Sequence, residues 1–384
     1  MPELLDLPDA CLAIILQHLP TAHSLASAMA THSQIAAVGH SYPETWRPLA
    51  EQVAWCLRRR CDEGWGELCK RAHCGAARQR LVAIGGAQQI FIPSIDDAAV
   101  DVYEIGNEAS DGAWQAANPL GRARDAPCAA SDGRRVHVLG GWDGKADCAL
   151  TCGESAEFDE HGIALCWEAL PELPEPRCFA AAVCDEQERL WVVGGGDSLY
   201  RGARCLSAVD LLMGDGWSRA GTLLEPRCGL ALAASARRSE LVVCGGYSGD
   251  VAYLSSVESF DMMTGRQSRI PSMTHHRSGL GACFGPDGGL YVVGGSEDGS
   301  NALSACERLD PREGKWHRLE DMQIARGYLA ASFSLDGRLY AAGGADSTGR
   351  PLDAFEIYEP RAGKWRHAPP LPSARANLAL VLMA

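Results

Sequence analysis

The chain has 384 residues, 46% of them apolar, and a formal net charge of −14 at pH 7. This apolar content is enough to build a core and argues against disorder, while the acidic charge disfavours nonspecific binding to nucleic acid or anionic membranes. The apolar runs are too short to span a bilayer, and the acidic start lacks the basic region of a secretory signal. We therefore expect a cytoplasmic or nuclear protein whose 16 cysteines are reduced thiols.

The first predicted element is an amphipathic helix within residues 7–20. Pro8 and Asp9 suit its start, and Pro20 ends it. Apolar residues fall on one face at positions i, i+3, i+4 and i+7, namely Leu12, Ile15, Leu16 and Leu19. The small helical module of residues 1–45 carries four acids and no Lys or Arg, a net charge of −4. Because so short a segment buries little surface alone, we expect it to dock on a partner or a neighbouring domain.

Residues 46–80 form a basic, helix-rich connector with eight Lys/Arg and four acids, a net charge of +4. The connector contains Cys56, Cys61, Cys69, His73 and Cys74. Their spacing lacks the tight cysteine pairs of zinc sites. Cys56 and Cys69 share helical faces with apolar residues, so thiols in a core are the preferred interpretation.

The N-terminal sequence resembles an F-box: it contains Leu7-Pro8-Asp9, Ile15-Leu16, Leu19-Pro20, Leu25 and Trp46-Arg47. Residues 65–71, Trp-Gly-Glu-Leu-Cys-Lys-Arg, resemble the stretch that often follows an F-box. The resemblance implies binding of a Skp-type adaptor, and through it a cullin–RING ubiquitin ligase, by Leu7, Pro8, Leu12, Ile15, Leu16 and Leu19. Residues 29–35 lack the Val-Cys-Lys-x-Trp pattern common in the family. The alternative is a helical cap that covers the next domain.

Residues 81–384 contain an internal repeat of about 50 residues, the length of one blade of a β-propeller. A Gly-Gly pair recurs at nearly constant spacing: Gly85-Gly86, Gly140-Gly141, Gly194-Gly195, Gly245-Gly246, Gly294-Gly295 and Gly343-Gly344. Each pair ends a short apolar run typical of a buried strand. An Arg precedes five of the pairs at an almost fixed distance (Arg124, Arg177, Arg227, Arg277, Arg326), and a Trp follows in five units (Trp114, Trp167, Trp217, Trp316, Trp365). In the fourth unit Gln267 or a neighbour replaces the Trp.

These units resemble kelch repeats, and the resemblance covers residues 81–384. The first unit begins at its Gly-Gly strand, Leu81, whereas the chain ends with a surplus Arg strand over residues 373–382. We predict that this last strand pairs with residues 81–84 and closes a six-bladed kelch β-propeller, mainly β in class. The repeated residues have structural roles: glycine permits close backbone approach, Trp packs between sheets, and the buried Arg donates to loop carbonyls.

The candidate binding site lies in the loops after Gly-Gly and at the residues after the recurrent Arg. In kelch proteins that bind peptides these segments line the ligand face, and the resemblance implies the same role for Asp125, Trp142, Asp143, Cys178, Asp197, Cys228, Tyr247, Asp250, Ser278, Glu297, Asp298, Tyr328, Asp346 and Asn377. Asp, Ser and Gly are also ordinary turn formers. Five of the six loops carry an acid, and converging acids focus a negative field, so we expect a protein substrate that is basic or neutral.

The sequence thus predicts a non-catalytic substrate-recognition subunit of an SCF-type ubiquitin ligase, without a metal or cofactor. One alternative is a kelch scaffold without a ligase link, for example a cytoskeletal one. A second is a kelch-type copper oxidase, which uses Tyr and His ligands with a modified Cys. Its best candidate pair is His275-His276, but adjacent side chains of an extended segment point to opposite sides. No Ser-His-Asp order or paired-carboxylate motif stands out.

Overall fold

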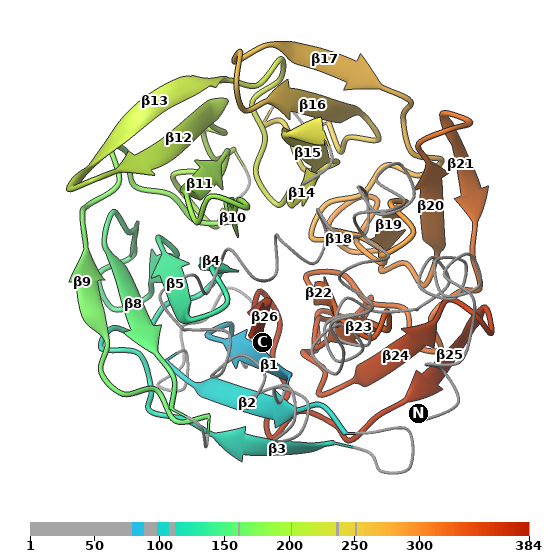
Figure 1. Cartoon of the computed structure of the whole chain (residues 1–384), viewed down its shortest axis with the longest axis horizontal. Coiled ribbons are helices and arrows are strands. Elements are labelled where there is room, and N and C mark those ends of the chain that lie inside the picture. Colours follow the sequence, from blue (N-terminus) through green and yellow to red (C-terminus); the bar gives the residue numbers. More distant parts are fainter. Residues whose placement is uncertain are drawn as a thin grey trace, which may run out of the picture. The chain divides into compact units, whose positions relative to one another are not determined.

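The computed structural model describes residues 79–87, 98–106, 112–159, 162–200, 202–235, 238–249 and 252–383. In these residues six four-stranded antiparallel sheets stand around a common centre (Figure 1). They confirm the predicted six-bladed β-propeller. The F-box-like module and nearly all of the connector lie outside the described residues, so these domain boundaries stay predictions. Within the described part, no helix is long and apolar enough to cross a membrane.

The strands of each blade are ordered from the centre of the ring outward (Figure 1). Blades 1 to 3 are β26 (Ala379–Met383), β1 (Arg80–Ile84), β2 (Val100–Glu104), β3 (Ala113–Ala116); β4 (Cys128–Ser131), β5 (Arg135–Leu139), β8 (Gly153–Glu157), β9 (Glu168–Leu170); and β10 (Ala181–Cys184), β11 (Leu190–Val193), β12 (Ala208–Met213), β13 (Gly216–Thr222). Blades 4 to 6 are β14 (Ala231–Ser235), β15 (Glu240–Cys244), β16 (Val257–Asp261), β17 (Gln267–Ile270); β18 (Gly281–Phe284), β19 (Leu290–Val293), β20 (Cys306–Asp310), β21 (Lys315–Arg318); and β22 (Ala330–Phe333), β23 (Leu339–Ala342), β24 (Phe355–Glu359), β25 (Lys364–His367). A short hairpin, β6 (Trp142–Asp143) with β7 (Cys148–Ala149), extends from blade 2.

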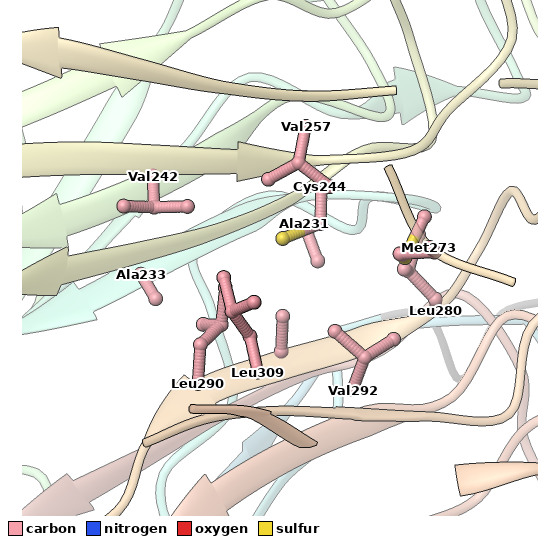
Figure 2. Close-up of a cluster of buried hydrophobic side chains, with 11 residues drawn as sticks. Ala231, Ala233, Val242, Cys244, Val257, Met273, Leu280, Leu290, Val292 and Leu309 are labelled. Atoms are coloured by element: carbon pink, nitrogen blue, oxygen red, sulfur yellow. The ribbon is translucent and has the colours of Figure 1, made fainter. Parts of the chain in front are cut away.

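The second strand of each blade is apolar on both faces because each blade packs against two neighbours. In β15, Leu241 and Val243 join the cluster shared with blade 3, whereas Val242 and Cys244 join the cluster shared with blade 5. Figure 2 shows the latter cluster, in which side chains of blade 4 pack against Leu290 and others of blade 5. Because successive strand residues point to opposite faces, burial on both sides requires an uninterrupted apolar run. This explains the runs that precede Gly-Gly in the sequence.

The C-terminal strand closes the ring as predicted. Strand β26 pairs antiparallel with β1, with Val381 opposite Val82. Blade 1 therefore combines strands from both ends of the propeller, which leaves neither end as an open sheet edge. The strand starts at Ala379, later than the predicted residue 373. The difference arises because Arg375 and Asn377 belong to the loop before it, where Asn377 has a φ of 58°.

The recurrent arginines are buried, and each forms an ion pair with an acid on the third strand of its own blade. The pairs are Arg124–Glu154, Arg177–Asp210, Arg227–Glu258, Arg277–Glu307, Arg326–Glu356 and Arg375–Asp101. Arg277 also donates to the carbonyls of Gly294, at 2.8 Å, and Ala305, at 2.9 Å, as predicted for loop carbonyls. Burial lowers the pKa of the Arg277 guanidinium, and the facing Glu307 opposes that shift. The arginines were predicted from the sequence, whereas the acids that pair with them were not.

The Gly-Gly pairs link neighbouring blades through close backbone contacts. The N–H of Gly141 donates to the carbonyl of Arg177 in the next blade at 2.9 Å. A Cβ on Gly140 would lie 2.3 Å from that oxygen, and a Cβ on Gly141 would lie 2.9 Å from the carbonyl of Asp125. Gly141 also has a φ of 98°, which side chains disfavour. Glycine is therefore required at both positions.

The outer strands are tied to the preceding blade by a side-chain hydrogen bond. The indole N–H of Trp316 on β21 donates to the carbonyl of Pro271 at 2.8 Å. The same bond is made by Trp114 to Pro369, Trp167 to Asn118, Trp217 to Pro171 and Trp365 to Glu320. In blade 4, Gln267 replaces the Trp, and its Nε2 donates to the carbonyl of Thr222 at 2.5 Å. Gln267 thus keeps the hydrogen bond without the aromatic surface.

Candidate functional site

The two segments from which the binding site was predicted lie directly against each other. The residue after each Arg pairs with the residue after each Gly-Gly through backbone hydrogen bonds. In blade 4 the N–H of Cys228 donates to the carbonyl of Tyr247 at 3.0 Å, and the N–H of Tyr247 donates back at 2.8 Å. The equivalent bridges are Asp125–Trp142, Cys178–Gly196, Ser278–Ser296, Gly327–Ala345 and Ala376–Ala87. We call the end of the propeller where these bridges lie the mouth.

A ring of backbone hydrogen bonds connects the blades at the mouth. It passes through the second residue after each Arg, and each of these residues has a positive φ: Ala126, Phe179, Gly229, Gly279, Tyr328 and Asn377. From Phe179 to Asn377, the N–H of each donates to the carbonyl of its predecessor, at 2.6 to 3.1 Å. The junction of Asn377 with blade 2 is bridged by its side chain, whose Nδ2 donates to Asp125 Oδ1 at 3.1 Å. The mouth is therefore a rigid frame.

The predicted binding residues divide into a buried and an accessible group. The buried group contains Asp125, Trp142, Cys178, Cys228, Ser278 and Asn377. The accessible or half-buried group contains Asp143, Asp197, Tyr247, Glu297, Asp298, Tyr328 and Asp346. Asp250 lies outside the described residues. The buried group lies beneath the surface of the mouth, and the accessible group forms that surface. A role in binding stays a prediction for both groups.

Aromatic side chains gather at the mouth. The rings of Phe179 and Tyr328, from blades 3 and 6, have centroids 6.0 Å apart. Trp142 packs with Cys178 in a buried cluster and meets the exposed ring of Tyr200 edge-on, at 5.7 Å between centroids. The amphipathic ring of a Tyr offers both apolar area and a hydroxyl, a combination enriched at protein interfaces.

The mouth acids build their own turns as well as carrying charge. Asp298 accepts hydrogen bonds from the backbone N–H groups of Asn301, at 2.7 Å, and Ser300, at 2.8 Å, and these bonds lower the pKa of its carboxyl group. Asp346 accepts from the hydroxyl and the N–H of Thr348, and the hydroxyl bond lowers its pKa. The turn bonds favour the ionised form of both carboxyl groups, so the turn role does not remove the charge.

Two of the acids face basic groups at the mouth. Asp143 pairs with Arg122 at 2.6 Å. Partial burial acts to raise the pKa of Asp143, but the bonds from Arg122 and from its own turn lower it overall. Glu297 Oε1 lies 2.9 Å from Nδ1 of His275. The local field at the Asp143 loop is therefore weaker than the acid count alone suggests.

The side chains of His275 and His276 do not point toward a common site. His275 contacts Glu297, whereas Nδ1 of His276 lies 3.0 Å from the backbone carbonyl of Tyr253. Across the described residues, no group of three or more His, Cys, Asp or Glu side chains is placed to hold a metal ion. His275 and His276 thus face different partners and do not form a shared pair of ligands.

Sequence reasoning missed four kinds of residue near the mouth. The acids that pair with the arginines follow them at a nearly constant spacing wherever both lie in one continuous unit, as from Arg277 to Glu307, and this spacing was a usable signal. Phe179 lies at the same position as Tyr328, directly after the residue that follows an Arg. The residue types of Arg122 and Cys205 do not recur at the equivalent positions of the other units, so only the three-dimensional structure identifies their partners.

Comparisons with known proteins agree with the fold. The kelch motif matches residues 229–274, 276–323 and 326–372. No curated protein matches the chain in sequence. A solved structure, "Structure of YjhT", is similar over 75% of this chain and 97% of that chain, with a TM-score of 0.60 and 13% sequence identity. At this identity the likeness concerns the fold alone. The chain therefore carries kelch repeats on a six-bladed β-propeller, a fold commonly used to bind proteins.

Proposed function

We propose that this chain is the substrate-recognition subunit of an SCF-type cullin–RING ubiquitin ligase and binds a protein substrate at the propeller mouth. The observation that carries the binding role is the contrast between the backbone and the accessible side chains of the mouth. The backbone bridge is the same in every blade, yet the residues that the mouth exposes differ, among them Phe179, Asp197, Tyr247, Glu297 and Tyr328. A rigid frame with different side chains at equivalent positions suits selective binding, because little entropy is lost when the partner docks.

The ligase link in this proposal rests on the F-box-like sequence. Leu12, Ile15, Leu16 and Leu19 form the apolar face that would bind a Skp-type adaptor. Catalysis of ubiquitin transfer would belong to other subunits of the complex. A kelch scaffold without the ligase is the competing function, and it differs in making no use of that face.

Adaptor binding by the full chain tests the proposal. Replacing Ile15 and Leu16 with Asp places charges in the interface, at a cost of about 2–5 kcal/mol each. We expect loss of co-purification with the Skp-type adaptor and an unchanged urea transition of the propeller. A matched control changes Ala13 and Gln17, which lie off the apolar face of the predicted helix, to Asp. Equal adaptor capture by both variants would favour the scaffold.

The charge of the mouth leads us to propose a basic or neutral substrate segment. Asp197, Glu297, Asp298 and Asp346 lie in its loops. Charges at the rim of an interface mainly steer association, so capture should weaken gradually as salt is added. Identification of an acidic peptide as the bound segment would contradict this part of the proposal.

A further inference from the structure

Two thiols from neighbouring blades meet at the mouth. Cys205 lies in the loop between β11 and β12 of blade 3, and Cys228 follows Arg227 at the start of blade 4. Their Sγ atoms are 3.3 Å apart. Cys205 Sγ also lies 3.1 Å from the carbonyl oxygen of Tyr247, the residue that pairs with Cys228. Neither cysteine is in a disulfide in this structure.

The pair occurs at one blade junction among those that the structure describes. Cys205 pairs with Gly196 in the loop of blade 3, and the same position recurs in other blades. At the equivalent junctions the two facing positions hold Ala149 and Cys178, Tyr253 and Ser278, Ala302 and Gly327, and Pro351 and Ala376. The two positions have the same backbone bridges in each of these blades, and among these junctions both are cysteine only between blades 3 and 4.

We propose that Cys205 and Cys228 are an oxidation site that forms a reversible disulfide across the junction of blades 3 and 4. A disulfide has an S–S length of about 2.05 Å, so the two sulfurs need to approach by about 1.2 Å. Cys205 lies in the loop between the second and third strands of blade 3, Cys228 lies just before the first strand of blade 4, and a backbone bridge holds each of them. The proposal concerns the thiols alone and does not depend on the ligase role.

A peroxide supplies the oxidising equivalents for the bond. Cys205 is the partly exposed member of the pair, and Cys228 is buried. The Cys205 sulfur attacks one oxygen of hydrogen peroxide, the O–O bond breaks, and a sulfenic acid and water form. The Cys228 sulfur then attacks the Cys205 sulfur, the S–O bond breaks, and a second water leaves. Two thiols and one peroxide thus give one disulfide and two waters.

The surroundings of the two thiols favour Cys205 for the reaction with peroxide and Cys228 for the second step, in which the disulfide forms. The hydrogen bond with Cys205 and burial both raise the pKa of the Cys228 thiol. A thiol with a raised pKa reacts slowly with dissolved oxidants. It is suited to the second step, in which its target sulfur is already adjacent. The nearby Cys178 is fully buried and its Sγ contacts the carbonyl of Gly196 at 3.5 Å, so it stays outside the pair.

Bond formation has a local consequence at the mouth. Cys205 loses its proton and no longer donates to the carbonyl of Tyr247. Tyr247 is one of the accessible residues of the mouth, and its ring lies 5.2 Å from that of Tyr253. If the mouth binds a substrate as proposed, oxidation changes the surface beside Tyr247.

Peptide mapping of the full chain tests the proposal directly. Trypsin cleaves after Arg204 and Arg227, so peptides 205–219 and 228–237 each carry one cysteine. The reduced, folded chain is treated with hydrogen peroxide, free thiols are alkylated, and the digest is analysed without reduction. We expect the two peptides to be the main linked species, lighter by two hydrogens than their sum and separated again by dithiothreitol. In urea the same treatment should give mixed pairings, because the proximity is lost.

Conservative variants complete the test. Cys205→Ser and Cys228→Ser should each remove the linked species, whereas Cys178→Ser should keep it. The proposal is overturned if the folded chain gives both peptides singly oxidised and unlinked, or if either is linked mainly to the peptide that contains Cys178.

Discussion

Each buried Arg and the residue that follows it are neighbours in the chain but behave in opposite ways across the six blades. The Arg is the same in all six and always meets a Glu or Asp on the third strand. The next position differs in nearly every blade, from Asp125 to Ala376, although its backbone bridge is the same. The repeat therefore fixes the interior by side chains and fixes the mouth mainly by the backbone, with the side chain of Asn377 bridging one junction. The variable position is itself buried, so the accessible side chains beside it form the surface proposed to bind.

The second residue after each Arg, which we call the ring position, has a constant backbone conformation and a variable side chain. Its left-handed backbone is constant, yet it holds a Gly in blades 4 and 5 and a Phe or Tyr in blades 3 and 6. A left-handed conformation is strained for residues other than glycine. The backbone ring over-determines this conformation, so Phe179 and Tyr328 are held there with their side chains at the mouth.

The largest expected effect comes from removing the strand that closes the ring. Deleting residues 374–384 removes β26 and leaves Asp101 without its Arg375 partner. A buried charge without its partner costs about 3–5 kcal/mol, and each lost apolar side chain costs about 1.5–3 kcal/mol. Together these match the roughly 5–15 kcal/mol typical of a whole domain, so we expect no cooperative transition. A urea melt checks this; a transition like that of the full chain would contradict the closure.

A smaller effect separates buried from exposed ion pairs. Glu307→Gln leaves the charge of Arg277 buried without its partner, and we expect a loss of about 3–5 kcal/mol in the free energy of unfolding. Glu168→Gln breaks an exposed pair with Arg135 and should cost less than about 1 kcal/mol. Urea midpoints measure both losses. Equal losses would mean that the buried arginines have no special structural role.

Blades 4 and 5 allow a comparison of the two residue types, Gln and Trp, that tie an outer strand to the preceding blade. Trp316→Ala removes a half-buried ring and a hydrogen bond, at an expected cost of about 2–3 kcal/mol. Gln267→Ala removes the hydrogen bond to Thr222 alone, at about 1 kcal/mol. The same urea experiment compares them. Equal losses of stability for Gln267→Ala and Trp316→Ala would contradict the expected stabilisation by the buried surface of the indole ring.

The smallest effect on stability is expected for the acids of the mouth. Asp143→Asn and Asp298→Asn keep acceptor oxygens for their turns, and Glu297→Gln changes an exposed side chain, so together the three should change stability by less than about 1 kcal/mol. Association with a protein captured by the wild-type chain should become slower and less dependent on salt. A matched control changes Glu168, Glu188 and Glu313, away from the mouth, to Gln. Identical salt dependence in both triple variants would show that the mouth acids serve only the turns.

The parts of the fold that follow from local pattern were predictable from the sequence. Gly-Gly, the apolar runs and the surplus last strand determined the number of blades and the closure, because each reflects a demand that recurs once in every blade. The acids of the ion pairs were overlooked, although their spacing is regular. Contacts between blades, such as that of Cys205 with Cys228, were beyond reach, since no pattern within one repeat specifies which loop residues of the next blade face them.

The central claim is that the interior stabilises the propeller while side chains at the mouth bind the substrate. Substitutions at the ring position test this claim most directly. Phe179→Gly and Tyr328→Gly together remove both rings, and glycine already holds this position at Gly229 and Gly279. We predict that this double variant keeps a cooperative urea transition within about 1–2 kcal/mol of the wild-type chain, because relief of backbone strain offsets part of the lost packing. It should capture the substrate of the wild-type chain at least ten-fold less. Undiminished capture, or loss of the folded propeller, would contradict the account.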